Sequence, residues 1–373
     1  MERTLLMEPR DPAIFRDGKP FGLGLPATSM PWPLPSVVIG TIRTRLGRLT
    51  GYDTDTVQRL LRIEHVGPFP AVRRGNAWSL AFASPADAVA YPAPAGKIEL
   101  CPLRPVESLP AGDGTDQPEG LRLVMGGRSQ KPADVPPFWS AAATSAWLKE
   151  PGCEPQLQSP EDLGLGALPR QRRVHLEIER ETQAAKKGML FATEGLEFAD
   201  QKLGRGICSR IRYDDGEQWA GLEALAPLGG EQRLSYWSEP EVEWVCAPGC
   251  LEGAELVRLQ LITPGHFAGG WRPGWLLPGD TGGTVPDIEG LDLSLIAAAV
   301  PRAVPQSGWD MTKPGGRSQK PTRFLAPAGS VYFCKVRKGD ARRLWMHSIC
   351  DDPQDRKDGF GLVLCGVWQW QQD

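Results

Sequence analysis

The chain has 373 residues, more than one hydrophobic core usually organises, so two domains are expected. Hydrophobic residues make up 41% and charged residues 23%, as in ordinary globular proteins, but 43 glycines and 36 prolines predict many turns and long ordered loops. A net charge of −3 excludes a globally basic protein that attracts nucleic acid at long range. We therefore expect an α+β protein, in which any RNA site is a local basic patch.

The N-terminal part is predicted to contain a strand, a loop and a helix. The apolar residues 4–7 form the strand, and Pro9 and Pro12 end it because proline lacks a backbone donor. A loop leads to Ser36, whose hydroxyl is placed to cap a helix that ends at Gly47. The buried face of this helix is predicted from three apolar residues at helical spacing, Val38, Ile42 and Leu46.

The middle of the chain has the pattern of short strands joined by ordered loops. Apolar runs at 79–83 and 98–103 lie between Pro/Gly-rich turns and predict strands, and residues 139–148 predict a helix. The proline- and glycine-containing stretch 150–155 is typical of a linker. We place a domain boundary near residue 165, which divides the chain into domains 1–165 and 166–373.

The second half contains the clearest strand pattern. Residues 174–179 alternate polar and apolar side chains, as in a half-buried strand, and residues 188–194 are its predicted partner. Residues 330–336 predict another strand. The final run, 362–370, is apolar enough for a central position in a sheet.

A seven-residue segment occurs twice. Residues 126–132, Gly-Gly-Arg-Ser-Gln-Lys-Pro, recur as residues 315–321. Two similar halves would place the copies in equivalent loops that offer Arg and Lys to phosphate, whereas a local sequence copy would have no shared role. Both interpretations stay open.

The cysteines and the hydropathy pattern bear on location and cofactors. The eight cysteines are scattered, which favours reduced thiols in the cytoplasm. Cys246 and Cys250 are the closest pair, but no second pair completes a zinc site, so we predict no metal and no cofactor. No apolar run approaches the roughly 20 residues that cross a bilayer, so we expect a soluble protein without a membrane partner.

Catalytic patterns are missing from the sequence. The four histidines, His65, His175, His266 and His347, lie far apart along the chain. No Walker loop, paired His-Asp element or Ser-His-Asp order occurs. We therefore predict a non-catalytic protein.

Three further segments carry a family resemblance. They are the proline- and arginine-containing start 8–21, the Gly-Trp-Asp element 308–310 followed by 326–333, and Asp358-Gly359-Phe360-Gly361 before the last apolar run. Taken in order, together with Leu34-Pro35-Ser36 and its helix, they resemble the third subunit of the Cmr module, the type III-B CRISPR RNA-guided effector. That family belongs to the RAMP proteins, and the resemblance implies two ferredoxin-like (RRM-like) domains with long ordered loops.

The resemblance also implies partners and a site. The subunit is expected to bind the 5′ repeat-derived tag of CRISPR RNA (crRNA), to dock the large polymerase-like subunit and the first backbone subunit, and to meet target RNA indirectly. Single-stranded RNA needs cations, close backbone approach and flat side chains. On these grounds the predicted RNA contacts are Arg16, Lys19, Ser36, Arg43, Arg45, Trp309, Lys320, Arg323, Gly359, Phe360 and Gly361.

Two alternatives belong to other functional classes. A guide-processing endoribonuclease of the RAMP superfamily would share the folds and the glycine turn but would need a reactive histidine, for which His65 and His347 are candidates. The 13 tryptophans of a loop-rich chain are also compatible with a carbohydrate-binding groove.

Overall fold

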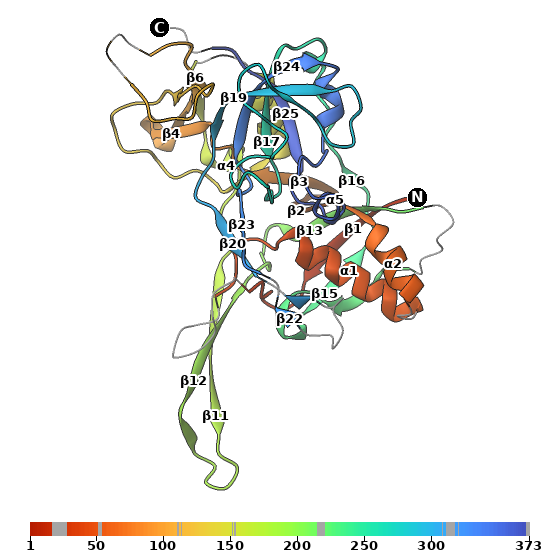
Figure 1. Ribbon diagram of the computed structural model, residues 1–373. Coiled ribbons are helices and arrows are strands. Elements are labelled where there is room, and N and C mark those ends of the chain that lie inside the picture. The colour runs from red at the N-terminus through yellow and green to blue at the C-terminus, as the bar shows by residue number, and fades with distance from the viewer. Residues whose placement is uncertain are drawn as a thin grey trace.

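The computed structural model describes residues 1–16, 28–50, 54–109, 112, 114–150, 152, 154–214, 221–307, 309–310, 318–319 and 321–370. Strands dominate this part of the chain and helices are few (Figure 1). Its strand pairs are antiparallel apart from that of β16 (Val242–Glu243) with β3 (Ala77–Ala83). The predicted α+β class is confirmed.

The largest sheet has nine strands in the order β10–β8–β3–β2–β13–β1–β15–β14, with β16 beside β3. The N-terminal strand is central in it, because β1 pairs with β13 on one side and β15 on the other. The boundary predicted near residue 165 falls within the span of this sheet, which takes strands from both sides of that position. The remaining strands are β1 (Glu2–Pro9), β2 (Glu64–Arg74), β8 (Phe138–Ser140), β10 (Gly164–Leu165), β13 (Gly204–Arg212), β14 (Ala224–Pro227) and β15 (Leu234–Ser238).

Two helices, α1 (Pro35–Thr50) and α2 (Thr54–Arg62), pack on the part of this sheet that contains β1 (Figure 1). The predicted face of α1 is confirmed, since Val38, Ile42 and Leu46 are fully buried. The predicted ends were wrong, because the helix begins at Pro35, before Ser36, and continues through Gly47. None of the described helices is long and apolar enough to cross a membrane.

A second sheet of five strands has the order β18–β19–β24–β17–β25. The strand predicted at 330–336 is confirmed as β24. The last strand was predicted to be central, but β25 ends the order of the sheet; it is nevertheless buried, because Gly366 packs closely against Leu148 of α3. The elements are β17 (Leu256–Leu261), β18 (Gly283–Thr284), β19 (Asp292–Ala299), β24 (Val331–Lys338), β25 (Val363–Val367) and α3 (Ala141–Lys149).

A buried charged cluster connects the second sheet to the segments inserted after β3. The Asp87 carboxylate accepts hydrogen bonds from Arg104 at 3.0 Å, from Arg258 of β17 at 2.6 Å and from the Trp147 indole at 2.8 Å. The smaller elements are α4 (Pro160–Leu163), α5 (Pro353–Asp358), β4 (Ala88–Pro92), β5 (Ile98–Pro102), β6 (Arg104–Pro105), β7 (Val124–Met125), β9 (Gln156–Gln158), β20 (Val304–Gln306), β21 (Trp309–Asp310), β22 (Ser318–Gln319) and β23 (Arg323–Leu325).

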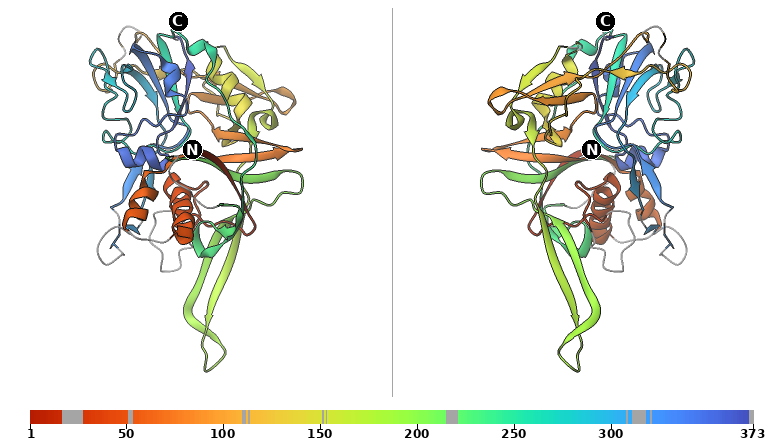
Figure 2. Two further views of the ribbon diagram at one scale, coloured as in Figure 1. Left: turned by 90° about the vertical axis from the view of Figure 1, so that its right-hand side faces the viewer. Right: turned by 90° about the vertical axis from the view of Figure 1, so that its left-hand side faces the viewer.

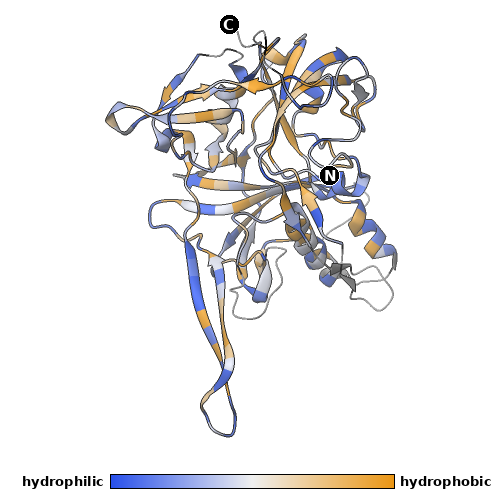
Figure 3. Ribbon diagram, turned by 60° about the vertical axis from the view of Figure 1, so that its left-hand side comes forward, coloured by the Kyte–Doolittle hydropathy of each residue, from blue (hydrophilic) through white to orange (hydrophobic). Residues whose placement is uncertain are grey.

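A long two-stranded arm projects from the body (Figures 1 and 2). It consists of β11 (Arg170–Ile178) and β12 (Ala185–Leu196), which pair in antiparallel fashion, so the predicted partnership of these segments is confirmed. The predicted half-burial was wrong, because no layer covers the outer part of the arm on either face. Apolar and polar residues alternate along it (Figure 3), and its large apolar side chains such as Val174 and Leu190 are exposed.

Candidate functional site

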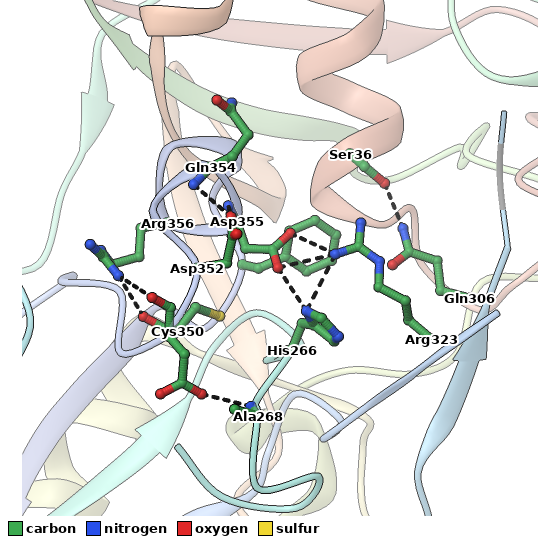
Figure 4. A network of polar contacts seen from close by, with 12 residues as sticks. Ser36, His266, Ala268, Gln306, Arg323, Cys350, Asp352, Gln354, Asp355 and Arg356 are labelled. Carbon is green, nitrogen blue, oxygen red and sulfur yellow. Dashed lines mark hydrogen bonds and ion pairs between the residues drawn. The ribbon is translucent and has the colours of Figure 1, made fainter. Parts of the chain in front are cut away.

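Several predicted RNA contacts meet around the short helix α5 and the turn Gly359–Gly361 that follows it. Arg43 reaches α5 from α1, and Arg323 reaches it from β23. Ser36 joins the same neighbourhood through a hydrogen bond from Gln306 of β20 (Figure 4). Residues more than 300 positions apart in sequence are thus gathered in one place.

The other predicted contacts lie elsewhere or are not described. Lys19 and Lys320 fall outside the described residues. For Trp309 the structure gives the backbone in β21 and nothing of the side chain. Arg16 is exposed at an isolated β-bridge, and Arg45 lines a groove of about 340 Å³ between α1 and β14.

The Arg43 guanidinium is held by hydrogen bonds to other parts of the protein. Its Nη1 lies 2.7 Å from Oδ1 of Asp358, its Nε donates to the Leu60 carbonyl at 2.9 Å, and its Nη2 donates to the Ile63 carbonyl at 3.2 Å. The side chain is largely buried. The guanidinium therefore ties α1 to the end of α2 and to α5, and its role as an RNA contact stays a prediction.

The glycine turn is packed against β2. Gly359 and Gly361 have φ values of +89° and +65°, and a Cβ at Gly359 would lie 2.7 Å from the His65 carbonyl oxygen. Both glycines are needed for this left-handed backbone and close contact.

The amides of the turn donate within the protein. That of Gly359 donates to the Arg356 carbonyl, and that of Gly361 donates to the Pro264 carbonyl at 2.9 Å. Phe360 is buried, and its amide donates to the Asp355 carbonyl. The interpretation that free amides here face phosphate does not hold in this structure, although the RNA role of the three residues stays a prediction.

Beside the turn, a carboxylate holds a histidine and an arginine (Figure 4). The buried Asp355 of α5 accepts from Arg323 Nη1 at 3.0 and 3.1 Å and contacts His266 Nδ1 at 2.8 Å. Both partners are partly exposed, Arg323 at 29% and His266 at 32% of their side-chain surface. The cluster therefore presents a cation and an imidazole ring to solvent.

Gln306 adds a buried amide beside Arg323. The two residues are cross-strand partners in β20 and β23, and the Gln306 amide donates to the Ser36 hydroxyl at 2.9 Å. The Oε1 atom of Gln306 is buried without a hydrogen-bond partner. Ser36 thus serves to join α1 to this strand pair and does not cap its helix.

Of the two histidines proposed for catalysis, His65 is buried and His347 is partly buried. The Nδ1 of His65 donates to the Asp358 carbonyl and its Nε2 accepts from the Ser209 hydroxyl, and burial lowers its pKa to about 4. Burial also lowers the pKa of His347, whose Nε2 donates to the Pro286 carbonyl. His175 lies on the arm and stacks on Phe191.

An apolar pocket of about 350 Å³ was not predicted from the sequence. It lies between the residues before α1, the base of the arm and the loop that begins at Ile262. Trp32 and Phe138 meet edge to face in its wall with ring centroids 5.2 Å apart, and Arg170 also lines it. Since its walls come from nine separate parts of the chain, no local sequence pattern marks it.

The repeated segment and the cysteines complete the inventory of predicted features. The first copy is an exposed loop after β7, in which Arg128 pairs with Glu99, whereas Ser318 and Gln319 of the second copy form β22. The described portions therefore have different local structures. Within the described ranges, no three His, Cys, Asp or Glu side chains gather as a metal site requires, and Cys246 and Cys250 are exposed free thiols.

Comparison with known proteins gives a family match. The profile of the family described as CRISPR-associated protein (Cas_Cmr3) matches residues 5–368. A chain of a solved structure described as Type III-B Cmr-beta bound to cognate target RNA is 14% identical, with 97% of this chain and 96% of that chain covered and a TM-score of 0.48. A chain of the complex that also holds AMPPnP is 13% identical, with 89% and 86% covered and a TM-score of 0.47. No curated protein sequence matches the chain.

Proposed function

The chain belongs to the Cas_Cmr3 family of CRISPR-associated proteins, and from this premise we propose that it is a non-catalytic subunit of a type III-B effector complex that binds the 5′ repeat-derived tag of crRNA. In this proposal it also docks the large subunit and the first backbone subunit, and so positions target RNA relative to active sites on its neighbours. Its location is the cytoplasm.

The observation that carries the RNA-binding proposal is the cluster of Arg323, His266 and Asp355 beside the glycine turn. An acidic chain needs a local cation to hold a phosphate, and Arg323 is held in place by a buried carboxylate while part of its side chain stays exposed. Arginine fixed in this way binds phosphate with little further loss of conformational freedom.

The strand order supports the proposed pair of ferredoxin-like domains. Four strands of the first sheet occur along the chain in the order β1, β2, β13 and β15. In the sheet they lie side by side in the order β2–β13–β1–β15. In the second sheet β17, β19, β24 and β25 lie in the corresponding order β19–β24–β17–β25. We propose that these are the two domains, which assigns the strands up to Ser238 to the first.

The arm supports docking of protein partners. Val174, Leu176 and Leu190 are between 51% and 64% exposed, although side chains of this kind are usually covered. Leu176 and Leu190 are cross-strand partners, so they form one apolar face with Val174. A neighbouring subunit that covers this face would stabilise the complex by burying it.

The environment of His65 favours a non-catalytic role over the endoribonuclease alternative. An acid–base catalyst must reach its substrate, whereas His65 has both ring nitrogens engaged inside the protein. The carbohydrate alternative is weakened because tryptophans such as Trp139, Trp147 and Trp237 fill cores.

Co-purification tests the proposal. A tagged chain isolated from its host should carry RNA with repeat-derived 5′ ends, and crosslinking should map those ends to peptides that contain Arg323 or α5. Arg323→Gln should reduce the slope of log affinity against log salt by about 0.7, the value for one phosphate on single-stranded RNA. Arg172→Gln, an exposed arginine on β11 of the arm, which projects away from α5 (Figure 1), is the matched control. Crosslinks that map to another polypeptide would contradict the proposal.

A further inference from the structure

Two neighbours of His266 determine which nitrogen of its neutral ring carries the hydrogen. Asp355 lies beside the guanidinium of Arg323, so its carboxylate is an acceptor only. His266 Nδ1 lies 2.8 Å from Oδ2 of Asp355, and two unprotonated acceptors at that distance would repel each other. Nδ1 therefore carries a hydrogen, and its 3.3 Å contact with Arg323 Nη1 is not a hydrogen bond to the ring.

This tautomer leaves a hydrogen-bond acceptor at the surface. In the neutral ring the second nitrogen, Nε2, holds a lone pair. It lies on the side of the ring away from Asp355 (Figure 4), and no described residue donates to it. Because the side chain is 32% exposed, a ligand can reach this atom.

Arg323 places donors next to that acceptor. Among the described residues its side-chain hydrogen bonds run through Nη1 to Asp355. The remaining guanidinium donors suit a phosphate oxygen. The site therefore offers a phosphate-binding cation and a hydrogen-bond acceptor side by side, both held by one carboxylate.

A ribonucleotide matches this pair of groups. Its 2′-hydroxyl is a donor adjacent to a backbone phosphate, whereas DNA has no donor at that carbon. We propose that His266 Nε2 accepts a hydrogen bond from a ribose 2′-hydroxyl while Arg323 binds the neighbouring phosphate, so that this site selects RNA over DNA. The inference rests on the proposed RNA-binding function and adds the group by which RNA is recognised. His266 is thus a specificity residue.

The test compares sugars on a fixed base sequence. The full-length chain is titrated with short single-stranded oligouridine, with oligodeoxyuridine, and with oligouridine that carries one 2′-deoxy or one 2′-O-methyl substitution at successive positions. At one position either substitution should weaken binding about threefold to tenfold, the value of one neutral hydrogen bond. His266→Phe keeps a ring and removes the acceptor, so it should weaken RNA binding equally, leave DNA binding unchanged and abolish the effect of the substitution at that position.

His175→Phe is the matched control, because His175 is also half-buried but lies on the arm. It should leave the RNA preference intact. If His266→Phe does not fold, the oligouridines with 2′-deoxy or 2′-O-methyl substitutions still test the inference on the unaltered protein.

Each of the following four outcomes overturns the inference. RNA binding without preference over DNA leaves the proposed function standing and removes the role of His266. An equal loss of RNA and DNA affinity in His266→Phe assigns the ring a structural or phosphate-binding role. Cleavage of the oligouridine by the parent and not by His266→Phe makes the residue catalytic. No RNA binding at all refutes this inference together with the proposed function.

Discussion

Nη1 of Arg43 lies 2.7 Å from Oδ1 of Asp358, and this ion pair joins positions 315 residues apart. Arg43 belongs to α1, which covers the first sheet, and Asp358 ends α5, which precedes the last strand of the second sheet. One side chain thus stabilises the contact between the two halves of the molecule beside the candidate RNA site.

Replacement of Arg43 should therefore act on stability. Arg43→Ala removes hydrogen bonds to Leu60, Ile63 and Asp358 from a largely buried position and should cost about 2–4 kcal/mol of the free energy of unfolding, measured in urea. Arg48→Ala, on an exposed position of the same helix, should cost less than about 0.5 kcal/mol. Unchanged stability with a salt-dependent loss of RNA affinity would identify Arg43 as an RNA contact instead.

Gly359→Ala should destabilise the protein by more than the cost of a left-handed alanine. The backbone there has φ +89°, and the new Cβ would meet the His65 carbonyl at 2.7 Å and the His65 ring at 2.8 Å. We expect a loss of about 2–4 kcal/mol in the free energy of unfolding. Gly75→Ala is the control, since φ is +66° but the space around it is open, and it should cost about 1 kcal/mol. Equal losses at both positions would show that packing against His65 does not matter.

Asp87→Asn should be among the most damaging conservative changes. Arg104 and Arg258 are each 1% exposed or less at the side chain and share this carboxylate, so its neutralisation removes a counter-charge from two buried cations at once. A loss of about 3–5 kcal/mol is expected from chemical denaturation. Glu99→Gln removes the partner of the exposed Arg128 and should change stability by less than about 1 kcal/mol. Similar effects of the two variants would contradict the assigned role of the buried cluster.

His65 should make the protein sensitive to acid. Its pKa is lowered from 6.5 to about 4 by burial, so as the pH falls below 6.5 the unfolded chain binds a proton that the folded protein excludes. The free energy of unfolding is unaffected above that pH and falls progressively down to about pH 4. At about pH 5 it is lower by roughly 2 kcal/mol. The free energy of unfolding at several pH values checks this. His65→Gln, whatever its stability at neutral pH, should fall less steeply with acid, and parallel curves would exclude His65 as the cause.

Polar substitutions on the arm should affect assembly without affecting the fold. Leu176→Ser with Leu190→Ser changes a solvent-exposed pair and should alter the free energy of unfolding by less than about 0.5 kcal/mol. The same variant should recover fewer partner subunits in a pull-down from its host. Glu177→Ser, a neighbouring polar position of β11, should recover them normally. Full recovery by the double variant would show that this face is not a docking surface.

Local patterns predicted the secondary structure well and the environment of each element poorly. The 3.6-residue spacing of Val38, Ile42 and Leu46 predicted the buried face of α1, because one neighbouring sheet is enough to bury it. Alternation in β11 predicted a strand correctly, but period two gives no information on whether a second layer covers it. The arm was therefore predicted as a strand pair and its exposure was missed.

In the candidate site, too, local structure was predicted from the sequence and the contacts between distant segments were not. The glycine-containing motif 359–361 predicted a turn, yet the Pro264 carbonyl that accepts from the Gly361 amide comes from a distant loop. His266, Arg323 and Asp355 lie on three segments with no shared motif, so only Arg323 was predicted as a contact, and His266 was considered only among scattered histidines. Their proximity depends on how β23, α5 and the loop after β17 pack together.

The arm has a consequence for the amount of this protein that stays soluble in a cell. Beyond the bridge of Leu196 to Ala13, no described strand pairs with the outer edge of β11 or β12, and apolar side chains are exposed between those edges, so two free copies can associate through their arms. We therefore expect copies made in excess of their binding partners to aggregate more readily than copies whose arms are covered. The geometry of one hairpin thereby links the yield of soluble chain to the abundance of its neighbours.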